Sequence, residues 1–92
     1  MKPFRSDARK SRANWRKHHV AFAEAETVFV NGVARIHDDP GHSEGESREI
    51  IVGHSATGRL LLIIFVEHAD HIRIISARKT TSIERHDYEE SR

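Results

Sequence analysis

The sequence predicts an α+β domain, in which two N-terminal helices precede an antiparallel sheet of about four strands and a C-terminal helix follows the sheet. Three observations indicate this order. Apolar residues recur at helical spacing early in the chain, they alternate or run continuously in its middle, and a helix-capping motif stands near its end. A length of 92 residues suits one domain with a thin core, so we expect residues 1–92 to form a single domain.

The first helix is expected over residues 8–18. Asp7 is a suitable N-cap, because its carboxylate can accept a hydrogen bond from a free N–H group of the first turn. The segment offers little apolar surface, so the helix should lie on the outside of the domain with Trp15 as its anchor.

The second helix is expected over residues 21–29, where an apolar stripe recurs at positions i, i+3 and i+7. The stripe consists of Phe22, Ala25 and Phe29. Asn31 and Gly32 end the helix, since both residue types accept a positive φ angle.

The sheet is expected from four segments, which cover residues 33–37, 47–52, 60–66 and 72–78. Short turns join the last three segments, which makes them antiparallel to their neighbours, and residues 38–45 form a loop. The segment 60–66 is apolar at every position, as in a central strand that is covered on both faces. Thr81 and Glu84 form a capping box, which starts the last helix.

The net charge of +1 hides an uneven distribution of charge along the chain. Residues 1–17 carry seven Lys and Arg against one acid, whereas residues 18–49 carry two against seven acids. A strongly basic end indicates a polyanionic or acidic partner at that surface. The simpler alternative is that these cations form the solvated face of the first helix.

The composition also excludes several classes of chemistry. Cysteine is absent, which excludes disulfides and thiolate catalysis, and the protein is expected in the cytoplasm. The longest apolar run, residues 60–66, is far shorter than the about 20 residues of a membrane span, and no signal peptide is expected. The eight histidines lack the spacing of metal ligands, so neither a metal nor another cofactor is expected.

Cleavage of RNA without a metal remains compatible with these residues. RNA supplies its own nucleophile, the 2′-hydroxyl group, so the protein need only move protons and stabilise the extra negative charge at phosphorus. The side chains suited to these tasks are Lys17, His18, Glu46, Arg48, Arg73, Arg78 and Tyr88. Each alone has a plainer explanation: Arg73 could form a cross-strand salt bridge, Glu46 and Arg48 could pair with each other, and Tyr88 could pack in the core.

Taken together, the candidates and their neighbours resemble the BrnT family of bacterial type II toxins, from Phe4 to Glu90. The matching motifs are Asn14-x-x-Lys17-His18-x-Val20-x-Phe22-x-x-Ala25, Val28-Phe29, His42-Ser43-x-x-Glu46-x-Arg48, Gly53-x-Ser55, Gly58-Arg59-Leu60-Leu61, Ile72-Arg73-Ile74-Ile75-Ser76-Ala77-Arg78-Lys79, Glu84-Arg85 and Tyr88-Glu89. The block from Ile72 to Lys79, with the Lys-His pair before it and the tyrosine after it, is specific.

The resemblance implies a RelE-like ribonuclease fold and inhibition of translation by RNA cleavage. It also implies neutralisation by a BrnA-like antitoxin that carries a DNA-binding domain, and a toxin–antitoxin hetero-oligomer that represses its own operon on operator DNA. Carried over by position, the seven candidates form the active-site set. We expect Arg73 and Arg78 to bind phosphate, because the guanidinium fork matches its oxygens, and His18 or Lys17 to transfer a proton.

Three positions depart from the family pattern. Arg5 and Ser6 stand before Asp7, where the family has a Trp-Asp pair; His19 replaces the glycine that follows Lys-His; and Ala21 replaces the serine that caps the second helix. His19 must then adopt a left-handed conformation at some strain. The missing cap at Ala21 costs about 1 kcal/mol.

Two of these departures lie beside Lys17 and His18, which leaves two alternatives to a toxic ribonuclease open. The protein could be a non-catalytic or attenuated module that binds RNA or the antitoxin and acts as a co-repressor. It could also be a metal-dependent enzyme that uses the histidines. Salt-sensitive RNA binding without cleavage would favour the first alternative, and loss of activity on chelation would favour the second.

Overall fold

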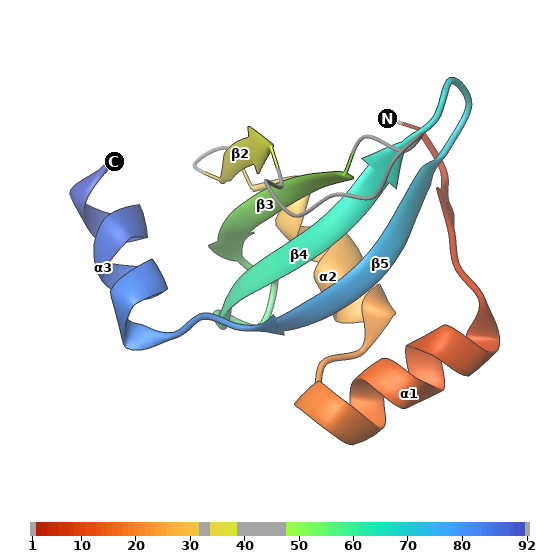
Figure 1. Cartoon of the computed structure of the whole chain (residues 1–92), viewed down its shortest axis with the longest axis horizontal. Helices are drawn as coiled ribbons and strands as arrows, with labels where there is room; N and C mark the ends of the chain where they lie inside the picture. The colour runs from red at the N-terminus through yellow and green to blue at the C-terminus, as the bar shows by residue number, and fades with distance from the viewer. Residues whose placement is uncertain (1, 32–33, 39–47, 92) are drawn as a thin grey trace.

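The computed structural model describes residues 2–31, 34–38 and 48–91, which form three helices and one sheet of five strands (Figure 1). The elements in chain order are β1 (Phe4–Arg5), α1 (Ala8–His18), α2 (Phe22–Val28), β2 (Arg35–Asp38), β3 (Arg48–His54), β4 (Leu60–Glu67), β5 (Ile72–Lys79) and α3 (Ser82–Glu90). The predicted order of two helices, four antiparallel strands and a C-terminal helix is confirmed. The predicted loop lies outside the described residues, except for Asp38, which ends β2.

The sheet has the strand order β1-β5-β4-β3-β2. Strands β2 to β5 form an antiparallel meander, as expected, whereas β1 pairs in parallel with the start of β5 at Ile72 and Arg73. The sequence did not predict β1, because two residues are too few to show an alternation of apolar and polar side chains.

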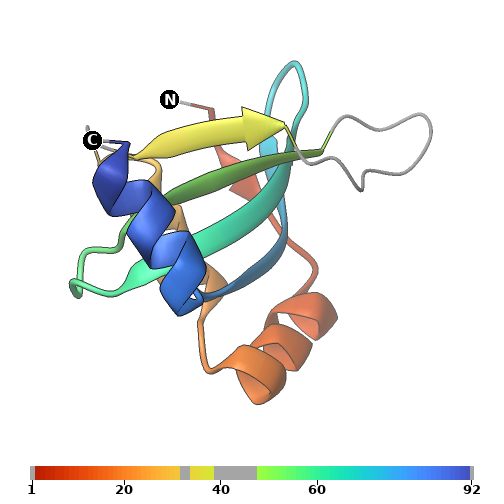
Figure 2. The same ribbon diagram turned by 60° about the vertical axis from the view of Figure 1, so that its left-hand side comes forward.

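Apolar side chains cover both faces of the sheet. Helix α2 packs on one face, in a cluster that includes Phe22, Ala25, Val28, Ile51, Ile63, Phe65 and Ile74. Helix α3 lies on the opposite face, in front of the sheet in Figure 2, and the smaller cluster there consists of Val52, Leu60, Leu62 and Tyr88. β4 contributes to both clusters, which explains why its sequence is apolar at nearly every position.

Helix α1 is anchored to the sheet by Asn14 rather than by Trp15. Asn14 is only 7% exposed, whereas Trp15 is 51% exposed, so the prediction that Trp15 is the anchor is wrong. The amide nitrogen of Asn14 donates to the carbonyl oxygens of Val20 (2.8 Å) and Ala77 (2.9 Å). Its oxygen accepts from the N–H group of Ala77 (3.0 Å). A carboxamide offers the same donor and acceptor as a peptide group, so Asn14 continues the hydrogen bonding of β5 beyond the end of β1.

The turn from α1 to α2 has the two features that its altered residues predict. His19 ends α1 in the left-handed region, with φ 56°, and donates its N–H group to the carbonyl oxygen of Trp15 (2.8 Å). Ala21 supplies no side-chain cap to α2. Glu24 instead accepts hydrogen bonds from the side chains of Ser55, Thr57 and Arg59. The hydrogen bonds from Arg59 lower the pKa of Glu24 to about 2.

No helix in the described part of the chain is both long enough and apolar enough to cross a membrane. The longest helix, α1, has 11 residues and lies against the edge of β5. Its length is close to half of the about 20 residues that a spanning helix needs.

Replacing Asn14 by alanine should lower the free energy of unfolding by about 2–4 kcal/mol, because the polar groups of Val20 and Ala77 would stay buried without partners. Urea unfolding followed by circular dichroism measures this loss. Arg12→Ala removes an exposed side chain of the same helix and should change the free energy of unfolding by less than about 0.5 kcal/mol. Equal stability of the two variants would contradict the role given to Asn14.

Candidate functional site

Three arginines lie in one row across the face of the sheet that packs against α3. The direct partners across neighbouring strands are Arg5 and Arg73, Arg73 and Val66, and Val66 and Arg48. Direct partners point to the same face of a sheet. Val66 and Leu62 are four residues apart along β4 and therefore share a face, and Leu62 packs with Tyr88 of α3. We call Arg5, Arg73 and Arg48 the arginine row.

The arginine row concentrates permanent positive charge. Neighbouring strands lie about 4.8 Å apart, so Arg5 and Arg73 extend from adjacent positions on one face of the sheet. The Nε atom of Arg48 is buried and has no hydrogen-bond partner among the described residues. A guanidinium group keeps its proton in proteins and presents a fork of N–H donors. A phosphate placed against the row would supply acceptors for these donors.

Arg78 lies on the same face, but its charge is balanced by α3. It is the cross-strand partner of Leu62, and its guanidinium group donates two hydrogen bonds of 2.8 Å to the two carboxylate oxygens of Glu84. These hydrogen bonds lower the pKa of Glu84 to about 2, and Glu84 raises the pKa of Arg78. Arg78 therefore ties α3 to β5, and a phosphate bound to Arg78 would have to share it with Glu84.

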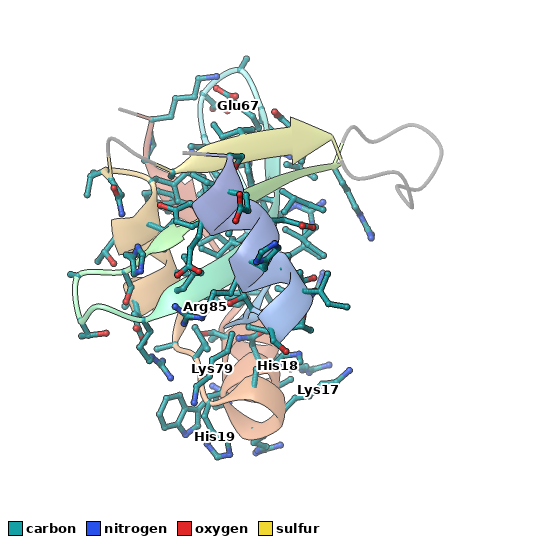
Figure 3. All side chains as sticks on the ribbon, turned by 90° about the vertical axis from the view of Figure 1, so that its left-hand side faces the viewer. Lys17, His18, His19, Glu67, Lys79 and Arg85 are labelled. Atoms are coloured by element: carbon teal, nitrogen blue, oxygen red, sulfur yellow. The ribbon has the colours of Figure 1, made fainter. Side chains whose placement is uncertain are left out.

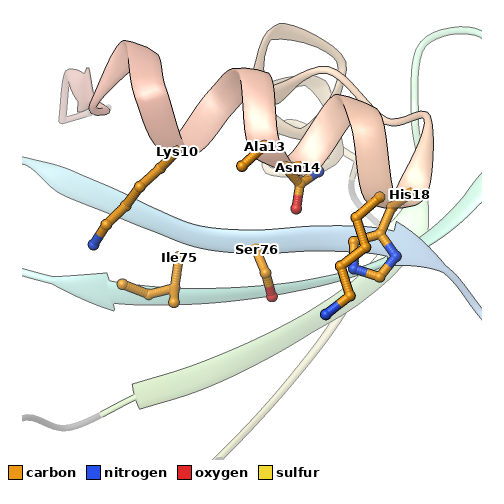
Figure 4. A pocket seen from close by; sticks show the side chains of 7 residues that line it. Lys10, Ala13, Asn14, His18, Ile75 and Ser76 are labelled. Carbon is orange, nitrogen blue, oxygen red and sulfur yellow. The ribbon is translucent and has the colours of Figure 1, made fainter.

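A hollow of about 320 Å³ opens between α1 and β5 (Figure 4). This α1–β5 hollow is lined by Lys10, Ala13, Asn14, Lys17, His18, Ile75 and Ser76. In β5, Ile75 is an extra residue, because its neighbours Ile74 and Ser76 pair with consecutive residues of β4. Ser76 lies along β5 between Arg73 and Arg78, so the hollow borders the face that carries the arginine row.

The anchoring of α1 directs its basic side chains into the α1–β5 hollow. Lys10 precedes Asn14 by four residues, and Lys17 and His18 follow it by three and four residues. Residues at these spacings share one face of a helix. Because Asn14 is hydrogen-bonded to β5, the three basic side chains lie on the side of α1 that faces that strand.

The structure places five of the seven predicted residues in the arginine row, beside it on the same face, or in the adjoining α1–β5 hollow. Lys17 and His18 line the α1–β5 hollow, Arg48 and Arg73 belong to the arginine row, and Arg78 shares their face. Their chemical roles stay predictions.

Of the other two candidates, Tyr88 packs on the same face of the sheet but is buried under α3. Tyr88 is only 3% exposed in the cluster under α3, and its ring centroid lies 5.8 Å from that of His54. Glu46 lies outside the described residues. The packing of Tyr88 agrees with the plainer explanation given for it, a residue of the core, and does not test a catalytic role.

Three residues at the site were missed by the sequence analysis. Arg5 was counted only as part of the basic end, since the strand that carries it is too short to predict. Lys10 was counted only among the cations of the basic end, and a solvated face of the helix was left open as the alternative for these residues. Ser76 reaches the hollow through the β-bulge, and nothing in the local sequence marks that bulge.

The histidines form no metal site in the part of the chain that the structure describes. No three His, Asp or Glu side chains there lie close enough together to hold an ion. His68 and His71 stack on each other at the turn between β4 and β5, with 4.4 Å between ring centroids, and His54 packs on Tyr88. Ring packing therefore accounts for these three histidines.

The fold and the site define a small α+β domain with cationic side chains gathered on one side of its sheet. A family model described as the ribonuclease toxin BrnT of type II toxin–antitoxin systems matches residues 7–84, and the chain belongs to this family. Among solved structures, the chain is similar to the ribonuclease toxin BrnT of Brucella abortus, with a TM-score of 0.67 and 19% sequence identity over 89% of this chain and 100% of that chain. At this identity the likeness shows the fold alone. No match was found among the curated proteins compared.

Replacing Glu84 by glutamine should lower the stability at neutral pH by about 1 kcal/mol, a small effect because solvent screens a pair that is about a third exposed. The folded protein holds the pKa of Glu84 at about 2, below its usual 4.5, so the stabilisation is complete above pH 4.5 and is lost as the pH falls to about 2. The difference in unfolding free energy between the wild type and the variant, measured in urea, should shrink over this range. A difference that is independent of pH would contradict the ion pair.

Proposed function

We propose that this BrnT-family protein is a metal-independent endoribonuclease, which inhibits translation by cutting RNA. The family is described as ribonuclease toxins, which supports the class of reaction. The observation that supports the proposal most directly is that the face of the sheet that carries the arginine row borders a hollow lined by Lys17 and His18. This arrangement offers phosphate ligands and proton-transfer groups to one stretch of RNA backbone.

The proposed reaction uses the 2′-hydroxyl group of the RNA as the nucleophile. Its oxygen attacks the adjacent phosphorus and its proton passes to a base, while the bond from phosphorus to the 5′ oxygen breaks and that oxygen takes a proton from an acid. Arg73 and Arg78 hold the phosphate, with Arg48 beside them on the same face, and they stabilise the extra negative charge that develops on it. His18 or Lys17 transfers a proton, and Glu46 and Tyr88 are the remaining candidates for the second transfer. The products are a 2′,3′-cyclic phosphate and a 5′-hydroxyl group.

The proposed partner is a BrnA-like antitoxin that carries a DNA-binding domain. A type II system neutralises its toxin with a protein, and the family description assigns the family to such systems. We propose that the two proteins form a hetero-oligomer, which represses its own operon on operator DNA in the cytoplasm. Purification of the co-expressed pair, followed by binding to a DNA fragment from upstream of the operon, tests this part of the proposal.

Replacing Arg73 by alanine should lower RNA cleavage in EDTA by about 100-fold or more, because it removes a donor that stabilises the charged transition state. Growth arrest on expression in a bacterium should disappear as well. Arg12→Ala is the matched control, since Arg12 lines a different hollow with Trp15 on another side of α1, and it should retain both activities. If the folded wild type, freed of antitoxin, leaves growth and RNA untouched, the proposal fails.

Replacing His18 and Lys17 by alanine, one at a time, should separate the two candidates for proton transfer. Replacing the residue that moves the proton should lower kcat by about 10²–10⁴-fold. Replacing the other should mainly raise KM, because the phosphate binds more weakly. Single-turnover cleavage and steady-state kinetics on the same RNA provide the two parameters. Two variants with unchanged kcat would exclude proton transfer by this pair.

A second candidate function is that of a non-catalytic RNA- or antitoxin-binding module, which acts as a co-repressor. The observation that favours it is the altered turn beside Lys17 and His18, where His19 is left-handed and Ala21 leaves α2 without a side-chain cap. Salt-sensitive RNA binding without cleavage would support this function. Cleavage products that end in a cyclic phosphate would exclude it.

A further inference from the structure

A second cationic hollow lies at the end of the sheet where β4 begins and β5 ends. Its volume is about 330 Å³, and its lining consists of Gly58, Arg59, Leu60, Lys79, Thr80 and Arg85. We call it the distal hollow. No residue of the α1–β5 hollow lines it, and none of the seven residues predicted from the sequence belongs to it.

The distal hollow carries positive charge that its own surroundings do not balance. Arg59 is paired with Glu24, but Lys79 is exposed and has no ion pair among the described residues. Arg85 is half-exposed, and its only acidic partner in that part of the chain is Glu89, at 3.9 Å. These cations therefore remain available to an anion.

The lining of the distal hollow is suited to a phosphate rather than to a protein segment. Its one large aliphatic side chain, Leu60, is only 2% exposed, so the lining presents no exposed aliphatic or aromatic side chain that could anchor a protein partner. The hydroxyl group of Thr80 is buried and has no hydrogen-bond partner among the described residues. Lysine and arginine donors around a small hollow are typical of phosphate sites.

Two contacts connect the distal hollow to the candidate active site. Arg59 donates a hydrogen bond of 3.1 Å to the carbonyl oxygen of His19, the residue after His18. Arg78 donates to the carbonyl oxygen of Lys79 (3.2 Å). In Figure 3, Lys79 and Arg85 are seen at the same end of the molecule as Lys17 and His18, and Glu67 marks the opposite end.

We propose that the distal hollow binds a second phosphate group of the same RNA strand, which flanks the phosphate at the cleavage site. The inference rests on the proposed function, since it takes the RNA held at the arginine row as the ligand. Lys79 and Arg85 then determine how strongly a longer RNA binds, and they do not touch the reacting atoms. The hollow makes the protein prefer an RNA strand that continues past the cleavage site over a single dinucleotide.

The direct test measures binding of a 2′-O-methyl RNA of about 12 nucleotides, which the protein cannot cut because the nucleophile is blocked. The double variant Lys79→Ala, Arg85→Ala should bind it about tenfold more weakly, and the slope of log affinity against log salt should fall by about 0.7 for one lost phosphate contact. The double variant Arg12→Ala, Arg16→Ala removes the same charge from another side of α1 and should bind within about twofold of the wild type.

Kinetics on cleavable RNA supply a second test. On an RNA of the same length, the Lys79→Ala, Arg85→Ala variant should have a KM about tenfold above that of the wild type and a kcat within about twofold of it. The lost contact is equally strong in the ground state and in the transition state, so it affects binding and not the chemical step. On a dinucleotide, which has no flanking phosphate, KM should change by less than about twofold. Thermal unfolding of each variant shows that the fold is retained.

The outcomes separate the inference from the proposed function. Equal weakening by both double variants would show an effect of net charge and overturn the inference. Unchanged RNA binding with lost antitoxin binding would overturn it too, and would assign the distal hollow to the protein partner. If the wild type cuts RNA and the Lys79→Ala, Arg85→Ala variant binds and cuts it equally well, the inference fails and the proposed function is retained. If the wild type cuts no RNA but the distal variant selectively weakens RNA binding, the proposed ribonuclease fails and the phosphate site stands.

Discussion

The side-chain amide of Asn14 is the interaction on which the arrangement of the site depends. Its three hydrogen bonds to Val20 and Ala77 are directional, so they determine both the distance of α1 from β5 and the rotation of the helix about its axis. An apolar contact would leave that rotation much freer. Because Lys17 and His18 share the face of Asn14, the same hydrogen bonds bring the proposed proton-transfer groups to the border of the arginine row.

The sequence was sufficient to predict the elements whose residues repeat over several turns or strand positions. The apolar stripe of α2, the continuous run of β4 and the capping box of α3 are all local patterns, and all were found where expected. The arginine row was not predicted, because it depends on the register between strands that are far apart in the chain. The pairing of Arg78 with Glu84 escaped notice for a related reason, since it crosses the turn from β5 to α3.

The anchor of α1 was mispredicted for a more general reason. Apolar size is the usual guide to burial, and Trp15 is the largest apolar residue of the helix. A polar residue is buried only where every donor and acceptor finds a partner, and those partners cannot be read from the sequence. For the site, the sequence therefore indicated which side chains were present but not how α1 turned them toward β5.

The turn between α1 and α2 is held by contacts that take over from the missing cap. Glu24 has no serine to pair with at the start of α2, and it binds Arg59 and two hydroxyl groups of the β3–β4 turn instead. Arg59 also donates to the carbonyl oxygen of His19, in the strained residue that replaces glycine. Neighbouring contacts thus offset the departures from the family pattern. The turn that follows Lys17 and His18 is held in place by Arg59, the residue before β4.

The extra residue in β5 has a consequence for the direction of its side chains. In a regular strand, residues an odd number of positions apart face opposite sides of the sheet. Arg73 and Arg78 are five positions apart and nevertheless face the same side, because Ile75 interrupts the alternation. If a strand with these same residues paired regularly, without the bulge, Arg78 would turn toward α2 and away from Glu84, although every charged residue of the sequence would be retained.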